Sequence, residues 1–312
     1  MYLGKSWVIL LLLCVGILGQ LPAGQTDAFV GISGSYRYAE DPSFPVHGAT
    51  VDLQGNLGHR MLLGETGFLG FSLYGTVSLD PATYSVSDHL LAGITNSWFF
   101  DAGVMEFAVE VDQSFFGSDG GSAFTVPSWS ASYGWERGYR TINPFVQYRG
   151  SATSGGSQHG LELGFSYSPS VELTYSTTVG GTYATSLPDF LATIAFGAEG
   201  LVGYLFNWEF GAEAAYRFAE DPTDESLSLR ASALFGYTPS RRMHIRFSPA
   251  LAATRERASG AWTIDGEALL RADVAIKDDL YWYVETGAFS SLVQDTVPTW
   301  YVQVRTGVDV SF

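Results

Sequence analysis

The sequence predicts an all-β protein, a closed antiparallel up-and-down transmembrane β-barrel of about 14–16 strands. Three observations predict it. Segment after segment alternates apolar and polar residues with period two, which is the pattern of a strand whose faces meet different surroundings. Many runs extend over about 10–16 residues, longer than the 5–6 usual in soluble sheets and enough to cross a bilayer at a tilt. Charged residues make up only 15% of the 312 residues, which is few for a soluble surface.

The N-terminal segment has the pattern of a secretory signal peptide. One basic residue precedes an apolar core of about twelve residues, and small residues follow at Ala23 and Ala28. We therefore expect residues 1–23 to be removed, with cleavage somewhere after 23 to 28, and the barrel to occupy residues 28–312. The alternative is a membrane anchor, for which the core is short. The only cysteine lies inside this segment, so the mature chain is expected to hold no disulfide.

The alternation can be followed along the chain from segment 28–39 to segment 298–312, and sixteen segments can be traced in this way. Segments 45–56 and 189–199 show the weakest alternation, so fourteen strands is the alternative count. An even number is expected if both ends of the chain lie on the periplasmic side of the membrane.

Residues 262–276 illustrate the pattern that the other long segments share. Ile264 and Leu270 fall on the apolar parity of this segment, whereas Asp265 and Arg271 fall on the opposite parity. Such a segment predicts a strand that meets lipid on one face and a polar interior on the other.

An internal repeat supports a hairpin as the building unit. "YRYAEDP" at 36–42 returns as "YRFAEDP" at 216–222, and "FSYSPS" at 165–170 returns as "FGYTPS" at 235–240. The repeat predicts a strand ending in Tyr-Arg, an outer loop, a return strand and a Pro-Ser turn.

Tight turns and longer polar loops are expected to alternate, with the tight turns on the periplasmic side. Tight turns are expected at 99–103, 135–138, 167–170, 237–242 and 276–279. "GSATSGGSQ" (150–158) and "AEDPTDES" (219–226) are expected to be outer loops. Aromatic residues gather near the ends of the expected strands, where their rings suit the two membrane interfaces. They include Trp98, Phe99, Phe100, Tyr133, Trp135, Tyr204, Phe206, Trp208, Tyr237, Tyr281, Trp282, Trp300 and Tyr301.

The last segment, "VQVRTGVDVSF", carries a family resemblance. Arg305, Gly307, Val310 and Phe312 give a polar residue, a glycine, a hydrophobic residue and a terminal aromatic. This pattern resembles that of the outer-membrane β-barrels of diderm bacteria, such as porins. The resemblance implies an integral outer-membrane protein, exported through the inner membrane, whose last strand is the signal read by the barrel-assembly machinery. It says little about activity, because one architecture serves many functions.

The polar parity is expected to face the lumen and to carry the residues of a pore. The predicted pore-lining residues are Glu213, Arg217, Arg230, Arg246, Glu267, Arg271, Asp273, Glu285, Arg305 and Asp309. A water-filled pore is one interpretation, and a lumen filled by cross-barrel ion pairs is the other. Fourteen to sixteen strands favour the pore, because about sixteen leave an aqueous channel. We hypothesise that Arg230, Arg246, Arg271 and Arg305 form a basic stripe that faces acidic residues across the lumen.

The function that these features favour is a passive channel for small hydrophilic solutes or ions, embedded in outer-membrane lipid. The formal net charge of −16 favours cations modestly and gives no nucleic-acid footprint. A structural or adhesive role without transport is the alternative. A hydrolase is a weaker one, since only His159 near Ser157 and His89 beside Asp88 suggest it. We expect no enzymatic activity, no catalytic residues, no cofactor and no metal.

Overall fold

The computed structural model describes residues 25–39, 48–80, 85–116, 122–135, 140–185, 189–277, 279–294 and 296–311. Within these ranges the chain forms sixteen β-strands and one 3-10 turn, η1 (Pro222–Asp224). The strands are β1 Gln25–Ala39, β2 Gly48–Leu63, β3 Gly67–Asp80, β4 Ser85–Phe100, β5 Gly103–Phe116, β6 Ser122–Trp135, β7 Ile142–Thr153, β8 Gly156–Ser170, β9 Leu173–Ala184, β10 Asp189–Val202, β11 Phe206–Phe218, β12 Ser226–Ser240, β13 Met243–Glu256, β14 Trp262–Lys277, β15 Leu280–Val293 and β16 Thr299–Ser311.

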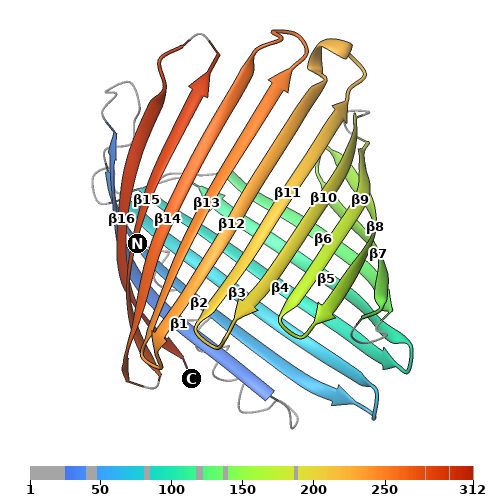
Figure 1. Ribbon diagram of the computed structural model, residues 1–312, viewed down its shortest axis with the longest axis vertical. Coiled ribbons are helices and arrows are strands. Elements are labelled where there is room, and N and C mark those ends of the chain that lie inside the picture. Colours follow the sequence, from blue (N-terminus) through green and yellow to red (C-terminus); the bar gives the residue numbers. More distant parts are fainter. Residues whose placement is uncertain are drawn as a thin grey trace.

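The sixteen strands form one closed barrel in which every strand pairs antiparallel with its neighbours in sequence (Figure 1). The ring closes between β1 and β16, whose register runs from Phe29 opposite Ser311 to Ala39 opposite Tyr301. The predicted fold class is therefore confirmed, with the higher of the two strand counts. The described part of segment 45–56 belongs to β2 and segment 189–199 belongs to β10, and both strands pair along most of their lengths like the others.

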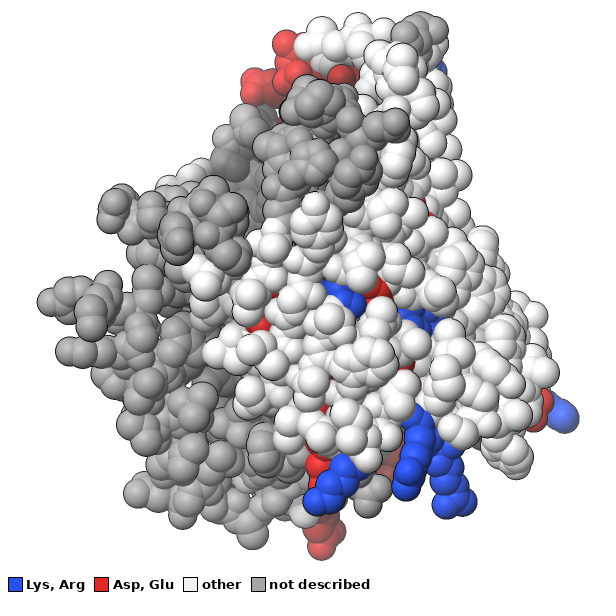
Figure 2. Space-filling model, turned by 90° about the vertical axis from the view of Figure 1, so that its left-hand side faces the viewer, with Lys and Arg blue, Asp and Glu red and all other residues white. Residues whose placement is uncertain are grey.

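The distribution of apolar side chains is the reverse of that in a soluble protein. Among the described residues, the buried apolar side chains are only Ala215 and Tyr283, whereas Ile32, Val109 and Ile194 are each 55% exposed. Most of the face in Figure 2 that is not grey is uncharged, and basic side chains protrude along its lower edge. A wall of exposed aliphatic side chains needs an apolar surrounding. In lipid the backbone must also pair completely, which the closed ring of strands achieves.

The connections differ between the two ends of the barrel (Figure 1). At one end, two-residue turns join β4 to β5, β8 to β9 and β12 to β13. At the other end, the loop between β11 and β12 contains η1, whose first turn is capped by the Asp221 carboxylate accepting from the Thr223 N–H at 2.9 Å. One expected outer loop is wrong. In 150–158, residues up to Thr153 belong to β7 and those from Gly156 to β8, which leaves a two-residue turn.

The internal repeat has a common structural cause. In both copies the register shifts at the Pro-Ser end of the strand, between Tyr167 and Ser170 in β8 and between Tyr237 and Ser240 in β12. Proline has no N–H to donate to a ladder, so it is tolerated where pairing is interrupted. The repeated motif therefore marks the point at which a strand leaves regular pairing and turns back.

Three of the sequence predictions fall wholly or mostly outside the described residues. They are the expected signal peptide at 1–23, the expected tight turn at 135–138 and the terminal Phe312. Strand β1 begins at Gln25, which is earlier than the expected start of the barrel at residue 28. In the part of the chain that the structure describes, no helix has the length and apolar character needed to cross a membrane.

Candidate functional site: the lumen wall

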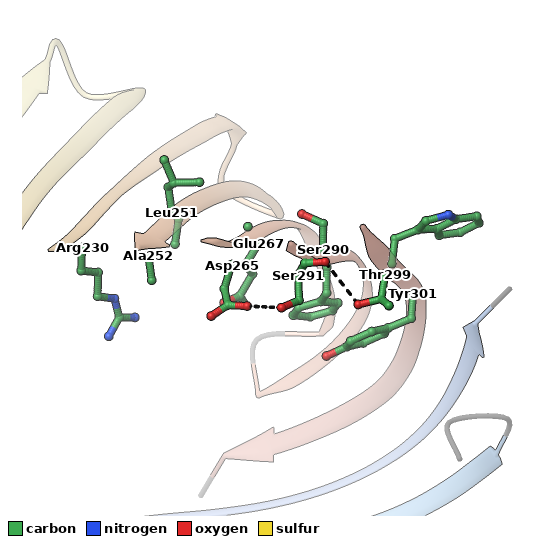
Figure 3. Close-up of a pocket in the computed structure, with 13 residues that line it drawn as sticks. Arg230, Leu251, Ala252, Asp265, Glu267, Ser290, Ser291, Thr299 and Tyr301 are labelled. Carbon is green, nitrogen blue, oxygen red and sulfur yellow. Dashed lines mark hydrogen bonds between the residues drawn. The ribbon is translucent and has the colours of Figure 1, made fainter. Parts of the chain in front are cut away.

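The inner face of the barrel, which we call the lumen wall, carries the polar parity of the strands. Glu213 lies directly opposite Arg230, and Arg271 lies opposite both Arg246 and Glu285. Directly opposed residues point to the same side of a sheet. Figure 3 shows Arg230 on the concave side of the sheet and Leu251 on the other. The register places all ten predicted residues on this inner face: Glu213, Arg217, Arg230, Arg246, Glu267, Arg271, Asp273, Glu285, Arg305 and Asp309.

Charges on β13 to β16 form an ion-pair network on the lumen wall. The Arg271 Nη2 lies 2.7 Å from the Asp273 Oδ1 and 3.5 Å from the Asp309 Oδ2. The Arg246 Nη2 approaches the other Asp273 oxygen at 3.2 Å. The guanidinium carbon of Arg271 also lies 3.9 Å from the ring centroid of Tyr283, whose side chain is 1% exposed. A stacked arginine with two carboxylate partners has little freedom to move, so this part of the wall is held rigidly.

The same arrangement continues across the closure of the barrel. The Arg305 Nη2 donates to the Ser33 Oγ at 2.9 Å and lies 3.4 Å from the Asp52 Oδ2. The hydroxyl of Ser78 donates to the Asp52 Oδ1 at 2.6 Å. Side chains from β16, β1, β2 and β3 are thus linked on the lumen side of the seam.

The expected free basic stripe is wrong for three of its four members. Arg246 and Arg271 form ion pairs with Asp273 on β14, and Arg305 forms one with Asp52 on β2, two strands away across β1. Arg230 differs, because no carboxylate among the described residues forms an ion pair with it, although Glu213 is its direct neighbour. Alternation identified the face that these arginines share. It could not give the pairing, which depends on the register between strands.

Most other charges of the lumen wall are acidic and lack an ion-pair partner among the described residues. Glu199 and Glu209 are even direct cross-strand neighbours, an arrangement of like charges that is unfavourable unless water or cations surround it. The carboxylates in this group are Glu106, Glu110, Glu162, Glu199, Glu209, Glu213, Asp265, Glu267 and Glu285. The corresponding arginines are Arg60, Arg149 and Arg230. The unpaired charge of the wall is therefore predominantly negative.

A cavity of about 310 Å³ lies in the lumen wall toward the end of the barrel that carries η1. Arg230, Asp265 and Tyr301 lie on its concave side in Figure 3, and the Ser291 hydroxyl donates to the Asp265 Oδ1 at 2.6 Å. The ring of Phe289 stacks on that of Tyr301, with 4.5 Å between ring centroids and 12° between ring planes. Both aromatic side chains point inward, because they are opposed in the register of β15 and β16 and lie an even number of residues from the inward-facing pair Glu285 and Arg305.

The two aromatic residues were missed by sequence reasoning. Tyr301 was expected at a membrane interface, but the register places it on the lumen wall, and Tyr281 likewise lies opposite the inward-facing Asp309. Phe289 was not singled out. The signal was available, since Phe289 and Tyr301 share the parity of Glu285 and Arg305 in their own strands.

Of the two histidine pairs that proximity in sequence suggested, His159 and Ser157 are hydrogen-bonded, whereas His89 has a partner on another strand. The Asp88 side chain lies outside the described part of the chain, and the His89 Nε2 lies 2.8 Å from the Asp112 Oδ1 on β5. The His159 Nε2 lies 3.0 Å from the Ser157 Oγ, with the Tyr148 hydroxyl 2.8 Å from the Nδ1. Residue 159 is opposed to Tyr183 on the outward face of the barrel, so this hydrogen-bonded group is separate from the lumen.

The residues of the expected assembly signal have clear places in β16. Val310 points outward opposite Val30, and Arg305 and Gly307 point inward. A Cβ at Gly307 would lie 2.6 Å from the Ile32 carbonyl oxygen and 2.8 Å from the Tyr283 hydroxyl. Gly307 is therefore the residue that allows β1, β16 and the ring of Tyr283 to pack closely.

Comparison by sequence gives no match, either to a protein family or to a curated protein. Comparison of folds with solved structures gives many. The anion-selective porin from Comamonas acidovorans has a TM-score of 0.56 at 11% identity, over 93% of this chain and 99% of that chain. OmpT, an outer membrane protein of Vibrio cholerae, has a TM-score of 0.58 at 10% identity, over 94% and 98%. Pseudomonas aeruginosa OpdQ has a TM-score of 0.52 at 9% identity, over 94% of this chain and 99% of that chain. The fold is that of outer-membrane β-barrel porins.

Proposed function

We propose that this protein is a passive channel of a bacterial outer membrane, through which small hydrophilic solutes and ions diffuse. The observation that carries the proposal is the closed barrel of sixteen strands with a polar, partly unpaired inner wall. About sixteen strands enclose more space than their own side chains fill, whereas about eight do not. The fold shared with porins supports the same function.

The charges of the lumen wall favour cations. Nine carboxylates without a described ion-pair partner face three such arginines, whereas the other described lumen arginines are paired. A narrow passage lined by one sign of charge concentrates ions of the opposite sign. Arg217 is one of the paired arginines, because it forms an ion pair with Asp189. The ten predicted residues thus fall into two groups. The paired residues stabilise the lumen wall, and the unpaired residues attract or repel ions in the channel.

Single-channel recording in planar lipid bilayers tests this function. We expect stepwise conductance and, under a KCl gradient, a reversal potential of the sign that indicates cation preference. Replacing Glu199 and Glu209 together by Gln should move the reversal potential toward zero. An insertion-competent barrel that gives no conductance would instead favour the structural or adhesive role.

We further propose that the chain is exported and then inserted by the barrel-assembly machinery, with Arg305, Gly307, Val310 and Phe312 as the signal. The support is the terminal pattern together with the seam that β16 completes. Deleting Phe312 should leave export intact but cause the protein to accumulate in the periplasm, as cell fractionation would detect. Normal amounts of the truncated barrel in the outer membrane would contradict this role.

The proposed channel acts without enzymatic activity, cofactor or metal. The polar groups of the lumen wall are used in ion pairs or left to meet water and solutes. The Ser157–His159 pair has a hydroxyl beside an imidazole, the arrangement of a nucleophile and a base. A fluorophosphonate probe tests whether it reacts, and covalent labelling of Ser157 would overturn the non-enzymatic assignment.

A further inference from the structure

We propose that the cavity between β12 and β16 is a binding subsite for saccharides on their way through the channel. It is formed by Arg230, Asp265, Glu267, Ser291, Phe289 and Tyr301. This inference deepens the proposed channel function, because it names a class of solute and the part of the wall that recognises it.

The aromatic pair supplies the apolar surface that such a solute needs. The rings of Phe289 and Tyr301 are nearly parallel and lie side by side on the lumen wall. A Cβ at Gly287 would lie 2.7 Å from the Phe289 ring and 2.7 Å from Leu269, so this glycine makes room for the ring. Two half-buried aromatic rings facing water bind a ligand that has both an apolar face and a polar edge. A pyranose ring has both, because its C–H groups form faces and its hydroxyl groups lie around the edge.

The polar groups around the aromatic pair suit hydroxyl groups. Arg230 is a donor, the Asp265 and Glu267 carboxylates are acceptors, and the Ser291 hydroxyl can be either. Among the described residues, neither Arg230 nor Glu267 has an ion-pair partner, and both line the cavity. A sugar hydroxyl both donates and accepts, so neighbouring hydroxyls can use a guanidinium and a carboxylate together.

The charges also argue against an ionic ligand. The two carboxylates and the aromatic rings would attract an organic cation, but Arg230 in the same cavity repels it. The carboxylates in turn repel an anion. A neutral ligand rich in hydroxyl groups satisfies donors and acceptors without either conflict.

A second cavity extends the first and indicates more than one sugar ring. It has a volume of about 410 Å³ and shares Arg230, Ala250 and Glu267 with the first cavity. Leu234 and Leu269 line the added part and provide further apolar surface. Ligand sites typically measure about 300–1,000 Å³, so the two together suit a short oligosaccharide.

Isothermal titration calorimetry of the detergent-solubilised barrel with maltotriose tests the subsite independently of conduction. We expect saturable binding that weakens about tenfold in Tyr301→Ala, since one aromatic contact contributes up to about 1.5 kcal/mol. Tyr301→Phe should retain most of the affinity. Phe145→Ala is the matched control, because Phe145 is a lumen aromatic beside Gly164 on another part of the wall. Its affinity should equal that of the wild type.

Current recordings separate failure of the subsite from failure of the channel. In a conducting barrel, maltotriose should reduce ion current at concentrations where polyethylene glycol of similar size has less effect. Conductance without maltotriose binding overturns the subsite alone, and binding without conductance overturns the channel alone. Binding of spermidine but not maltotriose would replace the saccharide by an organic cation, and equal weakening in Phe145→Ala would remove the assignment to this cavity.

Discussion

Gly307 lies where three parts of the barrel meet, on the lumen side of the seam. Its missing side chain leaves room for the Ile32 carbonyl oxygen, the Ser33 side chain and the Tyr283 hydroxyl, all within 2.8 Å of where a Cβ would be. A methyl group there must push against backbone, which cannot move without disturbing the ladder between β1 and β16. The glycine of the terminal pattern therefore has a role in packing apart from any role in recognition.

Gly307→Ala should destabilise the folded barrel by about 1–3 kcal/mol through overpacking. Urea unfolding in lipid vesicles would measure the loss. Gly34→Ala is the matched control, because it lies in β1 at the same seam but its Cβ would meet nothing closer than the Thr50 carbonyl oxygen at 4.0 Å. Equal stability of the two variants would contradict this explanation.

Glu225 links two loops at the end of the barrel that carries η1. Its Oε2 accepts from the Tyr216 hydroxyl at 2.8 Å and forms an ion pair with Arg257. The Tyr216 hydroxyl first, and then the Arg257 guanidinium, lower the pKa of Glu225 below its usual value of 4.5. Because the folded-state pKa is depressed, the stabilisation is present above the usual pKa and is lost as the pH falls through the folded-state pKa.

Glu225→Gln should make this loop pair more susceptible to proteolysis at pH 7, because the charge that Arg257 binds is removed. Limited proteolysis with an acid-tolerant protease should show the difference from wild type shrinking as the pH falls through the lowered pKa of Glu225, where the wild-type carboxylate becomes protonated. Glu220→Gln is the control, since Glu220 is exposed in the same loop. A difference that is independent of pH would exclude the carboxylate as its cause.

At the scale of single elements, the repeat of the Pro-Ser motif fixes where β8 and β12 turn. Both strands end in the same register shift, and because successive strands alternate in direction, the turns after β8 and β12 lie at the same end of the barrel. The loop with η1 lies at the opposite end (Figure 1). Which end faces the cell exterior follows from the expectation that short turns face the periplasm.

Labelling of single cysteines tests this orientation, and the mature chain is expected to contain no other cysteine. A cysteine at Thr223 should react with a membrane-impermeant maleimide on intact cells. A cysteine at Ser240 should react only after the outer membrane is permeabilised. The reverse pattern of labelling would show that the barrel has the opposite orientation in the membrane.

The sequence predicted the strands wherever apolar and polar residues alternate strongly. It predicted the ends of strands where a proline interrupts the alternation. The strands around 262–276 and 298–312 were evident because their two faces differ sharply. Residues 150–158 were wrongly expected to form a loop, because glycine and serine resemble loop composition. Gly150 and Gly156 are nevertheless paired, opposite His159 and Thr153. Small polar residues suit a lumen wall as well as a loop, so composition alone cannot separate the two.

For the whole molecule, the register between strands decides which lumen arginines form ion pairs within the wall and which face the open lumen. Alternation predicted the inward face of all the predicted residues, but pairing such as that of Arg305 with Asp52 joins positions at opposite ends of the sequence. The cavity with Phe289 and Tyr301 was likewise invisible, since it requires five adjacent strands in register. The face on which a residue lies follows from the local alternation of the sequence. The grouping of residues into a site depends on the register between strands in the closed sheet.

Arg271→Gln should therefore cost stability, about 1–3 kcal/mol, because it leaves Asp273 and Asp309 with one cation fewer in a partly buried place. Arg230→Gln should cost less than about 0.5 kcal/mol and instead increase cation preference, since its charge is not paired. Unfolding in vesicles and reversal potentials measure the two effects. Similar stability losses in both variants would show that the division of the arginines is wrong.

The seam between β1 and β16 also affects the order in which the barrel can form. Its partners stand about as far apart in sequence as the strands allow, from Phe29 with Ser311 to Ala39 with Tyr301. Synthesis proceeds from the N-terminus, so β1 is made first and waits longest for its partner. During that wait its edge offers unpaired N–H and C=O groups to any other strand. Every newly made copy therefore passes through a period in which this edge is open to pairing with the wrong strand, and that period ends only when β16 pairs with β1 and closes the barrel.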